Sequence, residues 1–146
     1  MRPEPPRRAD YRALRSITTR WMDNDFYGHV NNAVYYSFFD TVVTGWLIDQ
    51  GILDFRTGDT IGLAVESQCS YFAPVGYPDN LTGGMRVDRI GSSSVKYAVG
   101  IFREDQDEAA AAGTFTHVYV DRENRRPAPL DAEKRSKLEA VLAGSD

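Results

Sequence analysis

The chain has 146 residues, of which 42% are hydrophobic and 12% aromatic, and its formal net charge at pH 7 is −4. This length and hydrophobic content are enough for one domain with a substantial core. The acidic balance lacks the basic surface of nucleic-acid-binding domains, so we expect no nucleic-acid partner. The sequence has no run of about 18 apolar residues and no apolar signal-peptide core, so we expect no membrane partner and a cytoplasmic location.

Cysteine and histidine are scarce in this chain, which contains only Cys69, His29 and His117. A single cysteine cannot form an internal disulfide, which favours a reducing compartment. One cysteine and two histidines are also too few for a zinc cluster. We therefore expect neither a metal nor any other cofactor.

Residues 1–13 are expected to form a flexible tail, because residues 1–10 contain three prolines, three arginines and almost no apolar side chain. Such a segment buries too little apolar surface to offset the entropy lost on ordering. The next residues, 14–19, are typical of a strand.

Residues 20–33, Arg-Trp-Met-Asp-Asn-Asp-Phe-Tyr-Gly-His-Val-Asn-Asn-Ala, gather acids, a histidine and three asparagines directly before an apolar segment. In that segment apolar side chains recur at helical spacing and predict a long helix over residues 32–49 that ends at Gly51. The loop is therefore expected at a strand-to-helix turn, where we place the active site.

The start of a helix leaves backbone N–H groups unpaired at the positive end of the helix dipole. Such an end binds an anion or polarises a carbonyl group. Asn31 or Asn32 is a candidate N-cap, because its side-chain oxygen can accept from an N–H two or three residues further on. Gly28 would allow a tight turn in the loop.

The apolar face of the expected helix is wider than that of a surface helix, which indicates a helix largely wrapped by other structure. Gly45 lowers helix propensity by about 1 kcal/mol, so we expect a neighbouring backbone to approach closely there. A sheet curling around the helix would explain both features.

Alternating apolar residues predict a strand after the helix. Ile61, Leu63 and Val65 share one face of this strand, and we expect that face to continue through Ser67 and Cys69.

Turn residues separate three more strands, which are centred on residues 81–87, 95–101 and 110–121. The alternating charges of residues 130–143 predict a short amphipathic helix. Short connections imply antiparallel pairing, so we expect an α+β fold in which a five-stranded antiparallel sheet wraps a long central helix. Such a sheet leaves one flank of the helix uncovered, which predicts dimerisation.

The pattern Asp-x-x-Gly-His-Val-Asn-Asn at residues 25–32, preceded by Arg20, Trp21 and Asp23 and followed by Tyr35, resembles the signature of a known enzyme family. This family is the 4-hydroxybenzoyl-CoA thioesterase-like group of hot-dog-fold acyl-CoA thioesterases. Weaker similarities follow in the same order at Tyr71, Pro74, 79–81, 90–94 and 118–121.

The resemblance implies a hot-dog domain over residues 14–130, followed by a short C-terminal helix and tail over residues 131–146. It also implies a homodimer with two sites at its interface, further paired as a dimer of dimers. The implied reaction is hydrolysis of an acyl thioester of coenzyme A (CoA) or acyl carrier protein. CoA enters only as part of the substrate, and no metal is involved.

Asp25 matches the catalytic carboxylate of the family, as a nucleophile or as a general base toward water. A thiolate leaves easily, since an ordinary thiol has a pKa of about 8.5, so no strong general acid is needed. Backbone N–H groups near Asn31 and Asn32 would polarise the thioester oxygen. His29 would orient water or bind the substrate, or would pack within the loop.

The resemblance also predicts residues that contact the substrate. Tyr35 lines the acyl pocket or belongs to the core. Serine hydroxyls of the 92–94 turn would reach a site on the neighbouring subunit. The full set is Gly28, Val30, Tyr35, Ser93 and Ser94.

Several roles stay open at this point. Asp23 pairs with Arg20 or caps the turn. His29 keeps a hot-dog dehydratase or hydratase as an alternative function, and a non-catalytic acyl-thioester binding protein is another. Charge alone suggests six candidates for binding the CoA phosphates, namely Arg86, Arg89, Lys96, Arg103, Arg125 and Arg126.

Overall fold

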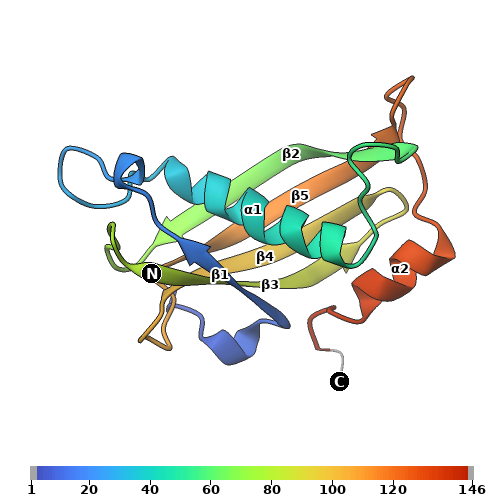
Figure 1. Ribbon diagram of the computed structural model, residues 1–146. Helices are drawn as coiled ribbons and strands as arrows, with labels where there is room; N and C mark the ends of the chain where they lie inside the picture. Colours follow the sequence, from blue (N-terminus) through green and yellow to red (C-terminus); the bar gives the residue numbers. More distant parts are fainter. Residues whose placement is uncertain (1–2, 145–146) are drawn as a thin grey trace.

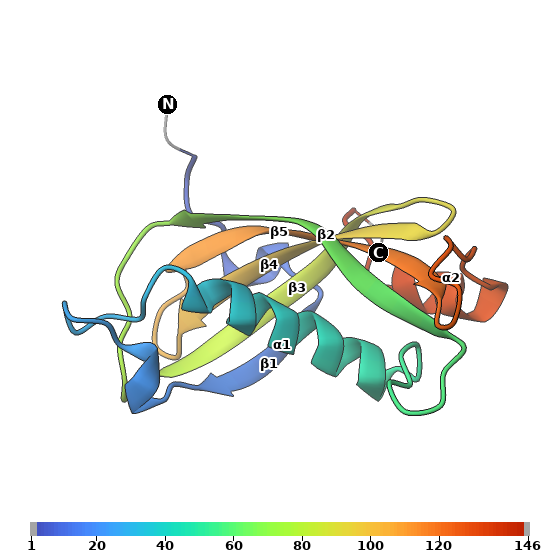
Figure 2. The ribbon, with the colours of Figure 1, turned by 90° about the horizontal axis from the view of Figure 1, so that it is seen from above.

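A computed structural model describes residues 3–144 of the chain, so residues 1–2 and 145–146 of the two expected tails lie outside the described residues. One antiparallel sheet contains five strands in the order β1-β3-β4-β5-β2, and helix α1 (Val34–Asp49) packs along one of its faces (Figures 1 and 2). The strands are β1 (Ala13–Thr18), β2 (Thr60–Tyr71), β3 (Asn80–Ile90), β4 (Ser94–Arg103) and β5 (Ala111–Asp121). The predicted α+β architecture is confirmed.

Helix α1 supplies the centre of the core. Its buried face consists of Tyr35, Phe38, Phe39, Val42, Val43 and Leu47, each at most 4% exposed. These side chains pack against the inward-facing apolar residues of the sheet. Full burial of one such side chain contributes about 2 kcal/mol, so this packing dictates where the helix lies.

The ends of α1 differ slightly from the prediction. The helix begins at Val34, and Gly51 follows its C-terminus with φ +71°, as expected for a terminating glycine. The neighbour predicted at Gly45 is not a backbone but the side chain of Arg15, whose Cζ would lie 2.5 Å from an added Cβ. Arg15 crosses this glycine to reach Asp49 at 2.8 Å.

Strand β2 does not keep the single face that its sequence predicts. A β-bulge between Ala64 and Glu66 inserts one unpaired residue, Val65, opposite β5. Because side chains alternate along a strand, one extra residue reverses the two faces beyond it. Ser67 and Cys69 therefore face α1, whereas Leu63 faces the opposite side of the sheet. The predicted continuous face is wrong.

The N-terminal segment differs from the expected tail. It forms a short 3-10 helix, η1 (Arg8–Asp10), and then buries the ring of Tyr11 on the sheet face opposite α1. An added Cβ at Gly84 or Gly100 would lie within 3 Å of this ring, so both glycines make room for it. The edge of Phe102 completes the contact at 5.8 Å between ring centroids.

The predicted C-terminal helix is present as α2 (Ala132–Glu139). Asp131 caps its start by accepting a hydrogen bond from the Lys134 backbone N–H at 2.8 Å. Leu138 is fully buried and joins the main core. Within residues 3–144, no helix is both long and apolar enough to cross a membrane.

A buried histidine lies in the core between α1 and the sheet. His117 on β5 is 4% exposed and touches the rings of Tyr97, Phe115 and Tyr119. Its Nδ1 atom has no hydrogen-bond partner among the described residues. Burial lowers the pKa of His117 from 6.5 to about 4, and the nearby charge of Asp40 opposes this shift only in part.

This shift predicts a stability that depends on pH. The unfolded chain binds a proton at His117 below about pH 6.5, whereas the folded chain does so only near pH 4. Stability conferred by the neutral imidazole is therefore complete above pH 6.5 and falls as pH drops toward 4. At 1.36 kcal/mol per pKa unit the loss is about 3 kcal/mol.

Urea unfolding of the wild type and of His117→Phe between pH 7.5 and 4 measures this effect. As pH falls from 7.5 to 4, the free energy of unfolding of the wild type should drop by about 3 kcal/mol relative to that of His117→Phe. Phe115→Leu alters the same cluster without removing a titratable group and is the matched control. A wild-type minus His117→Phe difference that stays constant with pH contradicts the assignment.

Candidate active site

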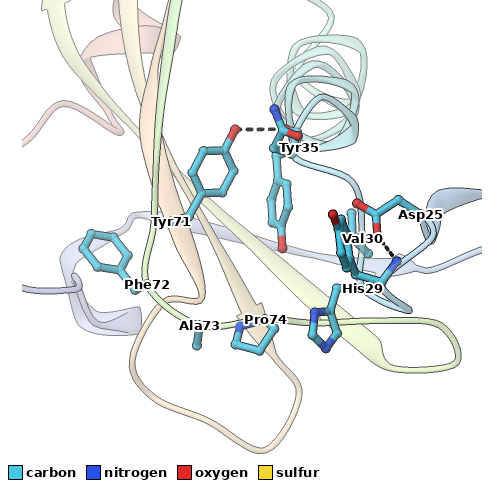
Figure 3. A pocket seen from close by; sticks show the side chains of 10 residues that line it. Asp25, His29, Val30, Tyr35, Tyr71, Phe72, Ala73 and Pro74 are labelled. Atoms are coloured by element: carbon cyan, nitrogen blue, oxygen red, sulfur yellow. Dashed lines mark hydrogen bonds between the residues drawn. The ribbon is translucent and has the colours of Figure 1, made fainter.

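A pocket of about 520 Å³ opens at the N-terminal end of α1 (Figure 3). One wall comes from the loop before the helix, and the other comes from the end of β2 and the segment after it. The lining residues are Asp25, Tyr27, His29, Val30, Asn32, Tyr35, Tyr71, Phe72, Ala73 and Pro74. Five of the nine predicted site residues therefore meet in one pocket.

A buried carboxylate anchors the loop that forms the first wall. Asp23 is 1% exposed and accepts hydrogen bonds at 2.8 Å from the backbone N–H and from Nη2 of Arg20. This confirms the predicted pairing of the two residues. The Asp23 carbonyl then accepts from the Asn31 N–H at 3.0 Å, so the anchor fixes both ends of the loop.

Both oxygens of the Asp25 carboxylate face hydrogen-bond donors. Oδ1 accepts from the Tyr27 backbone N–H at 2.9 Å, and Oδ2 accepts from the Asn31 side-chain amide at 3.3 Å. The loop closes on itself because the Asp25 N–H donates to the His29 carbonyl at 2.9 Å, and Gly28 turns with φ +81°. Asp25 is thus a half-buried carboxylate of fixed orientation at the pocket wall.

Asn31 joins the carboxylate to the start of the helix. Its Oδ1 accepts from the Ala33 N–H at 3.0 Å, and its carbonyl accepts from the Val34 N–H at 2.9 Å. Ala33, rather than Asn31 or Asn32, occupies the N-cap position, so the predicted cap is wrong by one or two residues. Asn31 Oδ1 still accepts from the N–H two residues further on, as predicted, but this bond lies in the turn before the helix.

Two tyrosines line the pocket beside Asn32. Tyr35 is 3% exposed, and burial raises its pKa to about 12. The Tyr71 ring packs edge-on against it at 5.2 Å, and the Tyr71 hydroxyl donates to the Asn32 carbonyl at 2.9 Å. Tyr71 was not predicted as a site residue, and only its place in the family resemblance pointed to it. The His29 imidazole lies on the far side of the pocket, near Pro74 (Figure 3).

Ser93 and Ser94 do not line this pocket. They lie at the β3–β4 hairpin, where the Ser93 carbonyl accepts from the Tyr119 N–H at 2.7 Å. A second groove of about 370 Å³ includes Ser94 beside the cations Arg89 and Lys96, and also the carboxylate of Glu66.

The other candidate phosphate ligands differ in their surroundings. Arg86 is paired with Asp88 at 2.8 Å, and Arg103 lies 3.7 Å from Asp105. For Arg89 and Lys96, no ion pair occurs within the described part of the chain. The same holds for Arg125 and Arg126, so what distinguishes Arg89 and Lys96 is that both line the groove that includes Ser94.

Known proteins resemble this chain in sequence and in fold. A sequence profile of the Thioesterase-like superfamily matches residues 19–138. Long-chain acyl-CoA thioesterase FadM of Escherichia coli (strain K12) is 26% identical over 127 residues, which cover 86% of this chain and 96% of FadM.

Two solved structures illustrate the match in three dimensions. The PA5185 protein from Pseudomonas aeruginosa is 48% identical with a TM-score of 0.93, covering 97% of this chain and 99% of that one. Slr0204, a 1,4-dihydroxy-2-naphthoyl-CoA thioesterase from Synechocystis, shares the fold at 18% identity and a TM-score of 0.76, covering 86% and 93%. The chain therefore belongs to the thioesterase-like superfamily of hot-dog-fold thioester hydrolases.

Proposed function

We propose that the protein hydrolyses the thioester of an acyl-CoA to a free acid and CoA, with Asp25 as nucleophile or general base. One observation carries this proposal: the Asp25 carboxylate is held by the Tyr27 N–H and the Asn31 amide at a pocket beside the start of α1. FadM is named as a long-chain acyl-CoA thioesterase and Slr0204 as a 1,4-dihydroxy-2-naphthoyl-CoA thioesterase, which supports an acyl-CoA substrate.

Asp25 serves the reaction in either of two ways. As a general base it takes a proton from water while the water oxygen bonds to the thioester carbon, and the C–S bond then breaks to release a thiolate that becomes protonated. As a nucleophile its own oxygen attacks, giving an acyl anhydride that water then hydrolyses. Both routes yield the same acid and thiol without a metal or other cofactor.

The developing negative charge on the thioester oxygen needs hydrogen-bond donors. Two N–H groups near this turn are already used, because the Asn31 N–H donates to the Asp23 carbonyl and the Val34 N–H donates to the Asn31 carbonyl. The Asn32 N–H, at the positive end of the helix dipole, is therefore our candidate donor to the thioester oxygen. The turn at Gly28 brings His29 to the same pocket, where its imidazole orients water or the substrate. Val30 and Tyr35 provide the apolar contacts for the acyl group.

Strand β2 suggests how the site becomes complete. It forms one edge of the sheet and exposes Leu63 (38%) and Val65 (59%). An exposed edge strand with apolar side chains is a template for pairing with another chain. We propose that two copies pair through β2 to form a homodimer, itself able to form a dimer of dimers.

Antiparallel pairing at β2 supplies the parts that one chain places far from Asp25. The hairpin with Ser93 and Ser94 lies at the end of the sheet opposite the pocket, so it serves the partner's site rather than its own. Arg89 and Lys96, which share a groove with Ser94, then bind the CoA phosphates. An acyl carrier protein would present a phosphopantetheine thioester to the same pocket.

Asp25→Asn keeps the size of the side chain and one carbonyl acceptor, yet removes both its nucleophilicity and its basicity. We expect kcat for acyl-CoA hydrolysis to fall about a hundredfold or more, with an unchanged melting temperature. Thiol release from a panel of aliphatic and aromatic acyl-CoA esters measures it. Retention of most activity removes Asp25 from the mechanism.

His29→Ala, on the same loop, is the matched comparison and should lower kcat less. Addition of EDTA should leave the rate unchanged.

If the wild type binds the esters without releasing thiol, the binding-protein alternative replaces the proposal. Turnover of enoyl or hydroxyacyl thioesters in its place would establish a dehydratase or hydratase.

Val65→Glu places a charge on the exposed edge of β2. We expect it to shift sedimentation from a dimer or larger assembly toward a monomer and to reduce activity, because each site needs both copies. Leu14→Glu is the control, since Leu14 is 55% exposed on β1 at the other edge of the sheet. A wild type that sediments as a fully active monomer contradicts an interface site.

Joint replacement of Arg89 and Lys96 by alanine should raise KM for acyl-CoA about tenfold and leave kcat nearly unchanged, because these charges bind a part of the substrate that does not react. Steady-state kinetics with acyl-CoA and with the matching acyl-pantetheine, which lacks the nucleotide phosphates, provide the measurement. An equal effect on both substrates, or none on either, argues against this assignment.

A further inference from the structure

The end of β2 reaches the candidate site because of the bulge between Ala64 and Glu66. In an uninterrupted strand Tyr71 would share the face of Ile61 and Leu63, away from α1. The extra residue places it opposite Ala111 on the inner face, where its ring meets Tyr35. An irregularity in an edge strand thus delivers this tyrosine to the pocket.

The Tyr71 hydroxyl binds the backbone at the centre of the site. It donates to the Asn32 carbonyl at 2.9 Å across 39 positions of sequence (Figure 3). The preceding residue, Asn31, holds the Asp25 carboxylate with its side chain, and the following residue, Ala33, leads into α1. This bond therefore attaches the turn at residues 31–33 to the sheet. The same turn links the Asp25 carboxylate to the N–H groups at the start of α1.

Two other hydrogen bonds join this loop to the segment after β2, at points away from the turn. The Val30 N–H donates to the Val75 carbonyl at 2.8 Å, and Asn24 Oδ1 accepts from the Tyr77 N–H at 2.9 Å. The peptide between Asn32 and Ala33 has the Tyr71 hydroxyl as its tie to β2. The N–H of the same peptide, on Ala33, donates to Asn31 Oδ1. Removal of the Tyr71 hydroxyl would therefore leave this peptide held only from within the loop, with its carbonyl no longer tied to the sheet.

We infer that Tyr71 is a positioning residue for thioester hydrolysis, which acts by fixing the peptide between Asn32 and Ala33 so that Asp25 and the helix N–H groups keep one geometry. This inference rests on the proposed function. The tyrosine ring contributes packing against Tyr35, and the hydroxyl contributes the orientation of the turn. The two contributions are separable, because phenylalanine retains the first and lacks the second.

Tyr71→Phe should therefore lower kcat about tenfold while KM changes less than about twofold and the melting temperature is nearly constant. Tyr77→Phe is the matched control: it removes a hydroxyl from a 45% exposed tyrosine beside the same loop and should change neither constant. An unchanged kcat in Tyr71→Phe overturns the inference. So does a change confined to KM, which would mean that Tyr71 binds substrate directly.

A double variant tests whether Tyr71 acts through the turn. If it does, adding Tyr71→Phe to Asn31→Ala should cost much less than tenfold, because the carboxylate has already lost its link to the turn. Multiplicative effects of the two changes overturn the inference.

Hydrogen exchange provides a measurement that does not depend on turnover. Amides of residues 31–36 should exchange faster in Tyr71→Phe than in the wild type, and Tyr77→Phe should leave them unchanged. If the wild type hydrolyses no thioester, the proposed function fails by itself. Equal exchange in wild type and Tyr71→Phe overturns the positioning inference, whatever the activity of the wild type.

Discussion

The packing of α1 against one face of the sheet is the constraint on which the rest of the structure depends. Six buried side chains hold the helix to the core, so its first turn cannot shift relative to the strands. The positive end of the helix dipole is thereby placed beside the end of β2, at the mouth of the pocket. The loop before the helix then needs only local hydrogen bonds to direct a carboxylate toward that end.

Those local bonds form a short, continuous network. The buried Asp23 carboxylate fixes the loop at one end, and Asn31 contacts both the Asp25 carboxylate and the backbone leading into α1. In the proposed reaction such a network favours catalysis, because the Asp25 carboxylate and the N–H donors are oriented before substrate binds. Packing of the core holds the start of α1 in place, whereas the hydrogen bonds of the loop orient the Asp25 carboxylate.

The two faces and edges of the sheet are used unequally. The N-terminal segment covers part of the face opposite α1 by burying Tyr11 against Gly84 and Gly100. The β2 edge instead remains exposed, with apolar side chains beside a groove that contains Arg89 and Lys96. This asymmetry is the reason why we propose β2 as the contact with a second copy, whose hairpin serines would then reach the site.

Local patterns in the sequence were sufficient for the long helix, its terminal glycine, the C-terminal helix and the clustering of Asp25, His29 and Asn32. Helical spacing and turn preferences depend on residues only a few positions apart, so they can be read along the chain. The pairing of Asp23 with Arg20 is local for the same reason. The helix was predicted to start two residues too early, at residue 32 instead of Val34. The side-chain oxygen of Asn31 accepts a backbone hydrogen bond in the turn before the helix, where such an asparagine is as favourable as at a helix N-cap.

Only the tertiary structure decided the strand order, the bulge in β2, the burial of Tyr11 and the arrival of Tyr71 at the pocket. Each of these depends on contacts between residues far apart in sequence, such as the 39 positions between Tyr71 and Asn32. A single unpaired residue in β2 reverses which side chains face the helix, and no alternation pattern reveals it in advance. The sequence by itself determined the loop of residues 20–33 and the helix after it, because both depend on residues close together in the chain. The opposite wall of the pocket, at the end of β2, was decided only by how this edge strand pairs with the rest of the sheet.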